Sequence, residues 1–307
     1  MTMNQTELDT LCRIAEAAGQ EIMAVYREGG EIWQKGDQSP LTEADLRADR
    51  VIRAGLEQHF AGVFILSEES VSAGQRDAER FFLVDPLDGT KEFLKRNDEF
   101  TVNIALIEHG EPVAGVVLVP ALAECFYAAR GLGVWKRNAT GVRAIATTAP
   151  LGPAEPLRVM GSRSHGGDKL DAWLATLDNE HTFVAAGSSL KFCRIAEGLA
   201  DIYPRFGPTS QWDTAAAQAV LEVAGGVVTD LEGTPLRYGL DRPVLNPEFV
   251  AAGNPALFAC WCDLWIDLAE FSAGRSQRVR QRTGGRGRDA GRGRVRLFLR
   301  AGGHALA

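Results

Sequence analysis

Two aspartates at the end of an apolar segment are the residues with the clearest capacity for chemistry. The segment F-F-L-V-D-P-L-D covers residues 81–88, and Asp85 and Asp88 follow directly after four apolar side chains. Carboxylates at the end of a buried strand are costly to desolvate unless a cation lies beside them. Because oxygen ligands of this kind suit Mg²⁺, we expect Asp85 and Asp88 to bind a divalent metal.

The residues around and after these aspartates can form an anion site. Pro86 favours a turn, Gly89 allows close approach of the backbone, and residues 90–94 can begin a helix whose free N–H groups face the acids. Such a helix start attracts phosphate. Metal ligands beside phosphate-binding donors indicate phosphoryl transfer or phosphate hydrolysis. An Asp-Gly turn is the simpler alternative, and it would suffice for an isolated D-G-T sequence.

Further acids lie at the ends of other expected elements. A short apolar strand at residues 63–66 leads into Glu68 and Glu69. Because two strands then end in carboxylates, we expect their carboxyl ends to converge on one site. Asp213 stands at the start of an Ala-rich helix that runs to residue 224, where an Asp by itself is typical of an N-cap.

A helix that begins after Thr42 has two acids in its first turn. Glu43 is interpreted as a partner of the helix dipole, whereas the role of Asp45 stays open on the sequence pattern alone. An amphipathic helix over residues 6–27 precedes it, with apolar residues spaced by three and four. Together with consecutive strands at 100–107, 113–119 and 125–129, these helices predict an α+β half with a mainly antiparallel sheet.

The remainder of the chain predicts a second half of different type. We expect an N-terminal α+β metal-binding domain at 1–150 and a C-terminal α/β substrate-binding domain at 151–271, where strand and helix patterns alternate. Residues 272–307 form an Arg/Gly-rich tail, which we expect to be disordered. A solvated appendage is the favoured interpretation of this tail, ahead of binding to RNA.

Charge and composition restrict the functional classes. The chain has 307 residues, of which 45% are hydrophobic, and a net charge of −7. The tail contains ten Arg and one Asp, a net +9, so residues 1–271 carry −16. An acidic body repels polyanionic ligands unless metal ions and local basic residues reverse the field at the site. The composition therefore also favours bound cations.

The sequence also bears on location and assembly. No apolar stretch approaches the roughly 18 residues that span a bilayer, and the N-terminus lacks the pattern of a signal peptide. We therefore expect a cytoplasmic protein with reduced thiols, and peripheral attachment to the inner membrane face stays open. Cys260 and Cys262 are interpreted as packing residues. The sequence leaves monomer and homodimer as alternatives.

Three motifs resemble a known family. Glu68-Glu69, D-P-L-D-G-T at 85–90 and W-D-T-A-A at 212–216 are similar, in this order, to motifs of the lithium-inhibited phosphatases that include inositol monophosphatase. The likeness extends through most of residues 5–255. It implies a layered α-β-α-β-α sandwich of the inositol monophosphatase and fructose-1,6-bisphosphatase type, in the α+β and α/β classes. It also implies two to three Mg²⁺ ions and inhibition by lithium.

The resemblance assigns roles to individual residues. The implied metal ligands are Glu68, Asp85, the carbonyl of Leu87, Asp88 and Asp213, with Asp85 bridging two ions. The same likeness places Asp45, Glu68 and Thr90 in catalysis, where Asp45 and the Thr90 hydroxyl orient the attacking water. The phosphate would lie at Asp88, Gly89 and Thr90. No covalent phosphoenzyme is expected.

Segments of the second half narrow the substrate. The sequences at 161–165, 187–193 and 203–208, with those at 91–97 and 101–107, resemble the CysQ-type 3'(2'),5'-bisphosphate nucleotidases. That branch removes the 3'-phosphate of adenosine 3',5'-bisphosphate (PAP), a by-product of sulfate assimilation, to give AMP and phosphate, and the conversion of PAPS to APS is a related possibility. The expected substrate contacts are His165, Ser188, Ser189, Lys191, Arg205 and Asp213.

Two other functions remain in competition. An inositol monophosphatase-like or sugar-phosphate phosphatase could use the same metal ligands. A non-catalytic protein that binds metal, or RNA through its tail, is a hypothesis of a different class. The complete set of Asp45, Thr90 and the metal acids favours an active enzyme over this last alternative.

Overall fold

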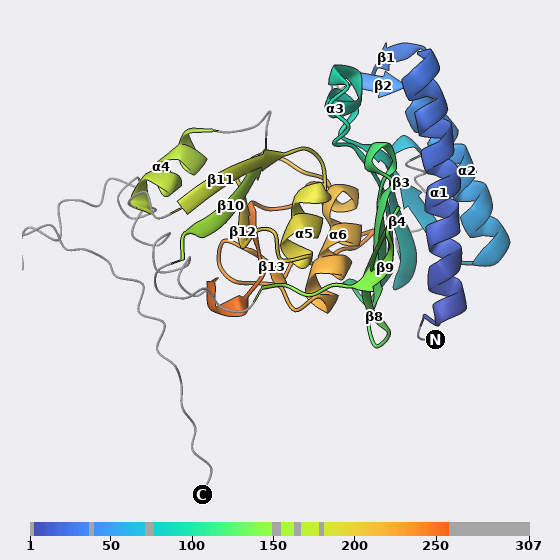
Figure 1. Ribbon diagram of the computed structural model, residues 1–307. Coiled ribbons are helices and arrows are strands. Elements are labelled where there is room, and N and C mark those ends of the chain that lie inside the picture. Colours follow the sequence, from blue (N-terminus) through green and yellow to red (C-terminus); the bar gives the residue numbers. More distant parts are fainter. Residues whose placement is uncertain are drawn as a thin grey trace, which may run out of the picture.

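The chain folds into an α-β-α-β-α sandwich, the layered architecture expected from the sequence (Figure 1). The computed structural model describes residues 3–36, 40–70, 77–148, 155–162, 167–177 and 181–257. The tail at 272–307, His165, Cys260 and Cys262 lie outside the described residues. Within the described part, no helix is both long and apolar enough to cross a membrane.

A seven-stranded sheet forms the first β layer, in the order β3-β4-β5-β6-β7-β8-β9. Its strands β3 and β4 are parallel, and every later neighbouring pair is antiparallel. The bounds are β3 Phe64–Ser67, β4 Arg80–Asp88, β5 Thr101–Glu108, β6 Glu111–Val119, β7 Glu124–Ala129, β8 Gly133–Asn138 and β9 Gly141–Ala144. The antiparallel meander from β5 to β7 matches the prediction.

Two helices cover the outer face of this sheet, α1 (Gln5–Glu28) and α2 (Glu43–His59) (Figure 1). Helix α1 begins at a capping box in which Asn4 and Glu7 exchange hydrogen bonds. Its apolar stripe packs with α2 and the strands in one continuous core. The short strands β1 (Ile32–Gln34) and β2 (Pro40–Thr42) connect the two helices as an antiparallel pair.

Helices α5 (Leu190–Ala196) and α6 (Gln211–Val223) lie between the two sheets. The second sheet has five strands in the order β11-β10-β12-β14-β13. The bounds are β10 Leu157–Ser162, β11 His181–Ala186, β12 Ile202–Arg205, β13 Val227–Asp230 and β14 Phe249–Ala252. Helix α4 (Asp168–Thr176) packs on its outer face through Leu170 and Trp173. The short helices are α3 Thr90–Lys95, η1 Glu68–Ser70 and η2 Pro120–Leu122.

The second half departs from simple alternation of strand and helix. Strands β10, β11 and β12 are parallel, as alternation requires, whereas β14 runs antiparallel to both β12 and β13. The sheet is therefore mixed. The division of the chain at residue 150 stays a proposal, because residues 149–154 lie outside the described part.

Candidate metal and phosphate site

Parallel pairing of β3 and β4 brings the first acids together. Ser67 is in register with Val84, so Glu68 and Asp85 follow at the same edge of the sheet. This is the convergence of strand ends that the sequence predicts. Strand β4 continues past Asp85, with an irregular register between Asp85 and Asp88 where it pairs with β5. The irregularity separates the two aspartates along the edge, so that both lie in the wall of the same cavity.

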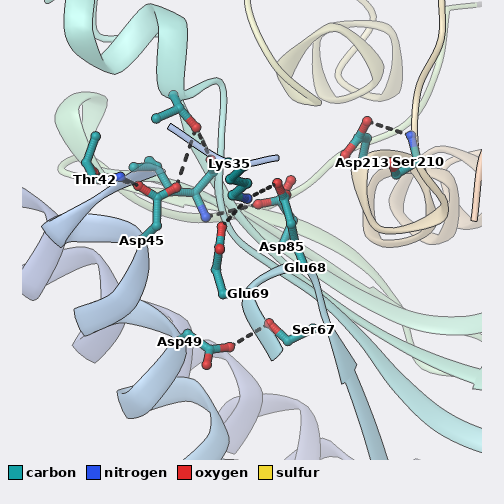
Figure 2. A network of polar contacts seen from close by, with 12 residues as sticks. Lys35, Thr42, Asp45, Asp49, Ser67, Glu68, Glu69, Asp85, Ser210 and Asp213 are labelled. Carbon is teal, nitrogen blue, oxygen red and sulfur yellow. Dashed lines mark hydrogen bonds and ion pairs between the residues drawn. The ribbon is translucent and has the colours of Figure 1, made fainter. Parts of the chain in front are cut away.

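Asp213 reaches this edge from the helix layer. Helix α6 begins at Gln211 with Ser210 as its N-cap, and the backbone N–H of Ser210 donates to Asp213 Oδ2 at 2.8 Å in a capping box (Figure 2). Asp213 therefore serves as the third residue of the helix and not as its N-cap. One carboxylate oxygen from each of Glu68, Asp85 and Asp213 lies within 4.8 Å of the others. Three acids from distant parts of the chain thus form one cluster.

The electrostatics of this cluster fit a bound cation. Burial raises the pKa of Asp85, and the negative charge of Glu68 raises it further. The pKa of Asp213 is raised by burial and then by the charge of Asp88. Clustered buried carboxylates without a neutralising charge are unfavourable in their ionised form. A hard divalent cation with oxygen ligands such as Mg²⁺ would remove this penalty, so the donor set suits the expected metal.

Asp88 is held in place by residues from both halves of the chain. Its Oδ2 accepts a hydrogen bond from the backbone N–H of Ser189 at 2.6 Å and longer contacts of 3.4 Å from Thr101 Oγ1 and Asn103 Nδ2. Burial raises the pKa of Asp88 to about 6. Asp88 also acts electrostatically on Asp213, which links it to the cluster.

Lys35 is a charged neighbour of the site that the sequence analysis missed. Its Nζ donates to Glu68 Oε1 at 2.5 Å and to Glu69 Oε1 at 2.6 Å (Figure 2). Burial lowers the pKa of Lys35, but the two carboxylates outweigh this effect and raise it above the ordinary value. Burial also raises the pKa of Glu69 to about 7. Lys35 therefore supplies part of the positive charge that this acidic edge requires.

Asp45 and Thr90, to which the family resemblance assigns a joint role, lie close together. The N–H and hydroxyl of Thr42 hold Asp45 Oδ2 at 2.7 and 2.5 Å, which leaves Oδ1 toward Thr90 Oγ1 at 3.5 Å. Thr90 Oγ1 also lies 3.4 Å from the carbonyl oxygen of Leu87. Burial raises the pKa of Asp45 to about 6. Asp45 Oδ1, which Thr42 does not bind, is thus directed at the hydroxyl of Thr90.

A cavity of about 350 Å³ joins the acids to the second half of the chain. From the first half of the chain it is lined by the acids Glu68, Asp85 and Asp88 and by Gly89 and Thr90. The left-handed conformation of Gly89, with φ of 91°, starts helix α3. The lining residues of the second half include Ser162, Ser188, Ser189, Lys191, Tyr203, Arg205, Pro208, Thr209, Trp212, Asp213 and Leu245.

Two basic side chains from the second half of the chain line the cavity, and Lys91 lines it from the first half. Lys191 is 4% exposed, and its Nζ donates to the carbonyl oxygen of Ser188 at 2.6 Å and to that of Ala186 at 3.2 Å. Burial lowers the pKa of Lys191 to about 8. Arg205 donates from Nη2 to the carbonyl oxygen of Pro208 at 3.0 Å, and its buried Nε has no hydrogen-bond partner among the described residues. Both residues were predicted to contact substrate.

The serine residues of the predicted set have different surroundings. Ser188 lines the cavity in a left-handed conformation with φ of 46°. The hydroxyl of Ser189 donates to Asn103 Oδ1 at 2.8 Å and lies 2.9 Å from Thr101 Oγ1. Because this hydroxyl is buried and engaged, Ser189 acts on Asp88 through its backbone, and a direct contact of the hydroxyl with substrate does not follow. His165 cannot be placed, because it lies outside the described residues.

Comparison with known proteins gives a consistent result. The model of the inositol monophosphatase family matches residues 3–262. A protein of Salmonella typhimurium named 3'(2'),5'-bisphosphate nucleotidase CysQ is 48% identical over 79% of this chain and 98% of its own length. The protein of the same name from Escherichia coli K12 is 47% identical over the same shares of the two chains.

Solved structures agree on the fold. The crystal structure of CysQ from Bacteroides thetaiotaomicron matches with a TM-score of 0.71 and 35% identity, over 81% of this chain and 97% of its own. The Thermotoga maritima IMPase TM1415 matches with a TM-score of 0.72 over 87% of this chain and 99% of its own. At 24% identity, this second likeness concerns the fold alone.

Proposed function

Because the chain belongs to the inositol monophosphatase family, we propose that it is a Mg²⁺-dependent phosphatase that hydrolyses the 3'-phosphate of adenosine 3',5'-bisphosphate to AMP and phosphate. The observation that carries this proposal is one cavity that is lined both by the carboxylates of Glu68, Asp85, Asp88 and Asp213 and by Lys191 and Arg205. The relatives named 3'(2'),5'-bisphosphate nucleotidase support the choice of substrate. PAPS, which carries the same 3'-phosphate, is a second candidate substrate.

Five groups would hold two to three Mg²⁺ ions in this proposal. They are the carboxylates of Glu68, Asp85, Asp88 and Asp213 and the backbone carbonyl of Leu87. Bound Mg²⁺ neutralises phosphate charge and lowers the pKa of the attacking water. The mutual distance within 4.8 Å of the oxygens from Glu68, Asp85 and Asp213 supports a shared ion.

The chain's own residues orient the reaction. Thr90 Oγ1 lies between Asp45 Oδ1 and the carbonyl oxygen of Leu87, so its hydroxyl hydrogen can be donated to either acceptor. An accepting lone pair of Thr90 then remains for a water molecule beside the acids. Asp45 is fixed by Thr42, which keeps this arrangement rigid. The N–H groups of Gly89 and Thr90 would bind the phosphate oxygens.

Lys191 and Arg205 would distinguish a bisphosphate from a monophosphate ester. A second phosphate requires its own cationic partners, whereas a neutral polyol leaving group does not. Arg205 brings a guanidinium to the cavity wall, and its buried Nε has no hydrogen-bond partner among the described residues. Lys191 is an ammonium in the same cavity wall.

A comparison of substrates tests the proposal against its main alternative. Steady-state release of phosphate is measured from adenosine 3',5'-bisphosphate, PAPS and inositol 1-phosphate at equal Mg²⁺. We expect kcat/KM to be largest for a nucleotide. A clear preference for inositol 1-phosphate would instead support an inositol monophosphatase-like enzyme that uses the same acids.

The variant Asp88→Asn tests the metal ligands. Removal of one charge without change of shape is expected to lower turnover by about 10²-fold or more and to weaken Mg²⁺ binding. Titration calorimetry with Mg²⁺ and circular dichroism separate loss of metal from loss of fold. Asp171→Asn, an exposed substitution on α4 outside the cavity, serves as the matched control. Near-normal turnover by Asp88→Asn would refute the assignment.

A further inference from the structure

Leu245 is an exposed apolar side chain in the cavity, and hydrogen bonds fix the segment that carries it. Leu245 is 61% exposed and lines the cavity. The large apolar residues that share this lining, among them Phe192, Tyr203 and Phe249, are buried. Among the described residues, Leu245 is thus the large aliphatic side chain that a ligand in the cavity can cover. Pro208, which is also exposed, lines the same cavity.

Hydrogen bonds fix the segment that carries Leu245. Leu245 forms an antiparallel bridge with Ser210, and the backbone N–H of Asn246 donates to the carbonyl oxygen of Thr209 at 2.8 Å. The Asn246 side chain donates to the carbonyl oxygen of Ser210 at 2.7 Å and to Thr214 Oγ1 at 3.0 Å. These partners belong to the start of α6, the helix that carries Asp213. The position of Leu245 is therefore fixed relative to the acids.

An exposed leucine on a protein surface needs no explanation by itself. The combination here differs, because an exposed apolar side chain that hydrogen bonds hold in place lines a cavity that also presents charged and polar groups. Binding sites for small molecules commonly pair a few polar contacts with an apolar surface that excludes water. The phosphates of a nucleotide would be satisfied by the acids' cations and the basic residues, and its base would still require an apolar face.

We propose that Leu245, together with Pro208, forms the contact surface for the nucleobase and makes the cavity selective for nucleotides over base-free phosphate esters. This inference rests on the proposed function. It adds a residue that determines specificity by contacting the base of the substrate and not its phosphates. The base would cover Leu245 and remove its side chain from water, which stabilises the complex.

The affinity for a matched ligand pair tests this inference without turnover. AMP and ribose 5-phosphate differ only in the base, and titration calorimetry in the presence of Mg²⁺ gives the affinity for each. The wild-type protein is expected to bind AMP more tightly. Leu245→Asn is expected to weaken AMP binding about fivefold, because half-burial of an apolar side chain is lost, and to leave ribose 5-phosphate unchanged. Leu245→Phe should retain or strengthen AMP binding.

Val244→Asn is the matched control, because Val244 is a neighbouring apolar residue with 38% exposure that does not line the cavity. It should alter neither affinity. Equal loss of both ligands in Leu245→Asn would indicate a structural role and overturn the inference, as would equal binding of AMP and ribose 5-phosphate by the wild type. Failure to hydrolyse adenosine 3',5'-bisphosphate while AMP binding depends on Leu245 would instead overturn the proposed function alone.

Discussion

Lys191 is a cation whose charge changes close to neutral pH. Burial lowers its pKa to about 8, so the ammonium loses its proton as the pH rises through that value. If Lys191 binds the second phosphate, KM for adenosine 3',5'-bisphosphate should rise above pH 8, because the phosphate then meets a neutral amine. The measurement is KM as a function of pH from 7 to about 9.5.

Two substitutions identify the source of this pH dependence. In Lys191→Arg the guanidinium stays charged across the range, so the rise in KM above pH 8 should disappear even where the absolute KM changes. Lys191→Met should give a high KM with no dependence on this ionisation. A wild-type profile retained in Lys191→Met would show that another group titrates.

Single residues were predictable where the signal is local in the sequence. Asp85, Asp88 and Glu68 each follow an apolar strand, and a carboxylate in that position demands a partner whatever the rest of the fold. No local pattern marks Lys35, because its role in the site depends on its contact with Glu68, 33 residues away, and on loop geometry. Asn103 was missed because it lies within an apolar strand and acts on residues of other elements.

Among the elements, α6 determines how the site is assembled, because it carries Asp213 and packs directly on the first sheet. The contact is unusually close at Gly115 of β6, where an added Cβ would lie 2.2 Å from the carbonyl oxygen of Ala216 and 2.9 Å from Ala219 Cβ. Small residues on both surfaces thus let the helix approach the strand. Asp213 reaches the strand-end acids because the helix lies this near.

Gly115→Ala tests the close packing of α6. We expect a loss of about 1–3 kcal/mol in the free energy of unfolding, because backbone atoms cannot move aside as a flexible side chain would. Mg²⁺ affinity should fall as well, since a displaced α6 moves Asp213. Denaturant unfolding and titration calorimetry measure the two effects. Gly36→Ala, where an added Cβ meets nothing within 4 Å, is the control and should change the stability little.

Elements with strong periodicity were predicted, and weakly patterned ones were not. Helices α1, α2 and α6 and strands β3 to β7 have apolar residues that face a core, which leaves a clear pattern. Strand β9 is exposed at all four residues, so nothing in its composition marks it as a strand. Strand β14 is buried at all four residues, so apolar and polar side chains do not alternate along it. Its antiparallel pairing with β12 joins residues that are far apart in the sequence.

At the scale of the molecule, the site exists only where the two halves of the chain meet. Glu68, Asp85 and Asp88 come from the first sheet, whereas Asp213 and Lys191 come from the helices between the sheets. The sequence motifs predict that these groups meet but not how the halves are held together. The architecture was predictable through family resemblance, while the contacts between the layers required coordinates.

A buried ionic network joins the first sheet to helix α5. Glu197, at the end of α5, accepts hydrogen bonds from Lys136 at 3.0 Å, Arg194 at 2.6 Å and Arg143 at 2.7 Å. Glu124 on β7 adds contacts of 2.6 Å to Lys136 and 2.8 Å to Arg194. The side chain of Glu197 is 1% exposed. Glu197 therefore pairs with three cations from two layers, and two of these cations also contact Glu124.

Glu197→Gln is expected to destabilise the protein by about 2 kcal/mol, because Lys136 and Arg194, which are largely buried, each lose one of the two carboxylate partners described for them. Removal of one cation as well, in Glu197→Gln with Lys136→Met, should recover part of this loss, since the remaining charges are better balanced. Denaturant unfolding measures both values. The control is Lys169→Met, which breaks the more exposed pair with Glu248 and should cost less than about 1 kcal/mol. If Glu197→Gln costs no more than this control, the network does not hold the layers together.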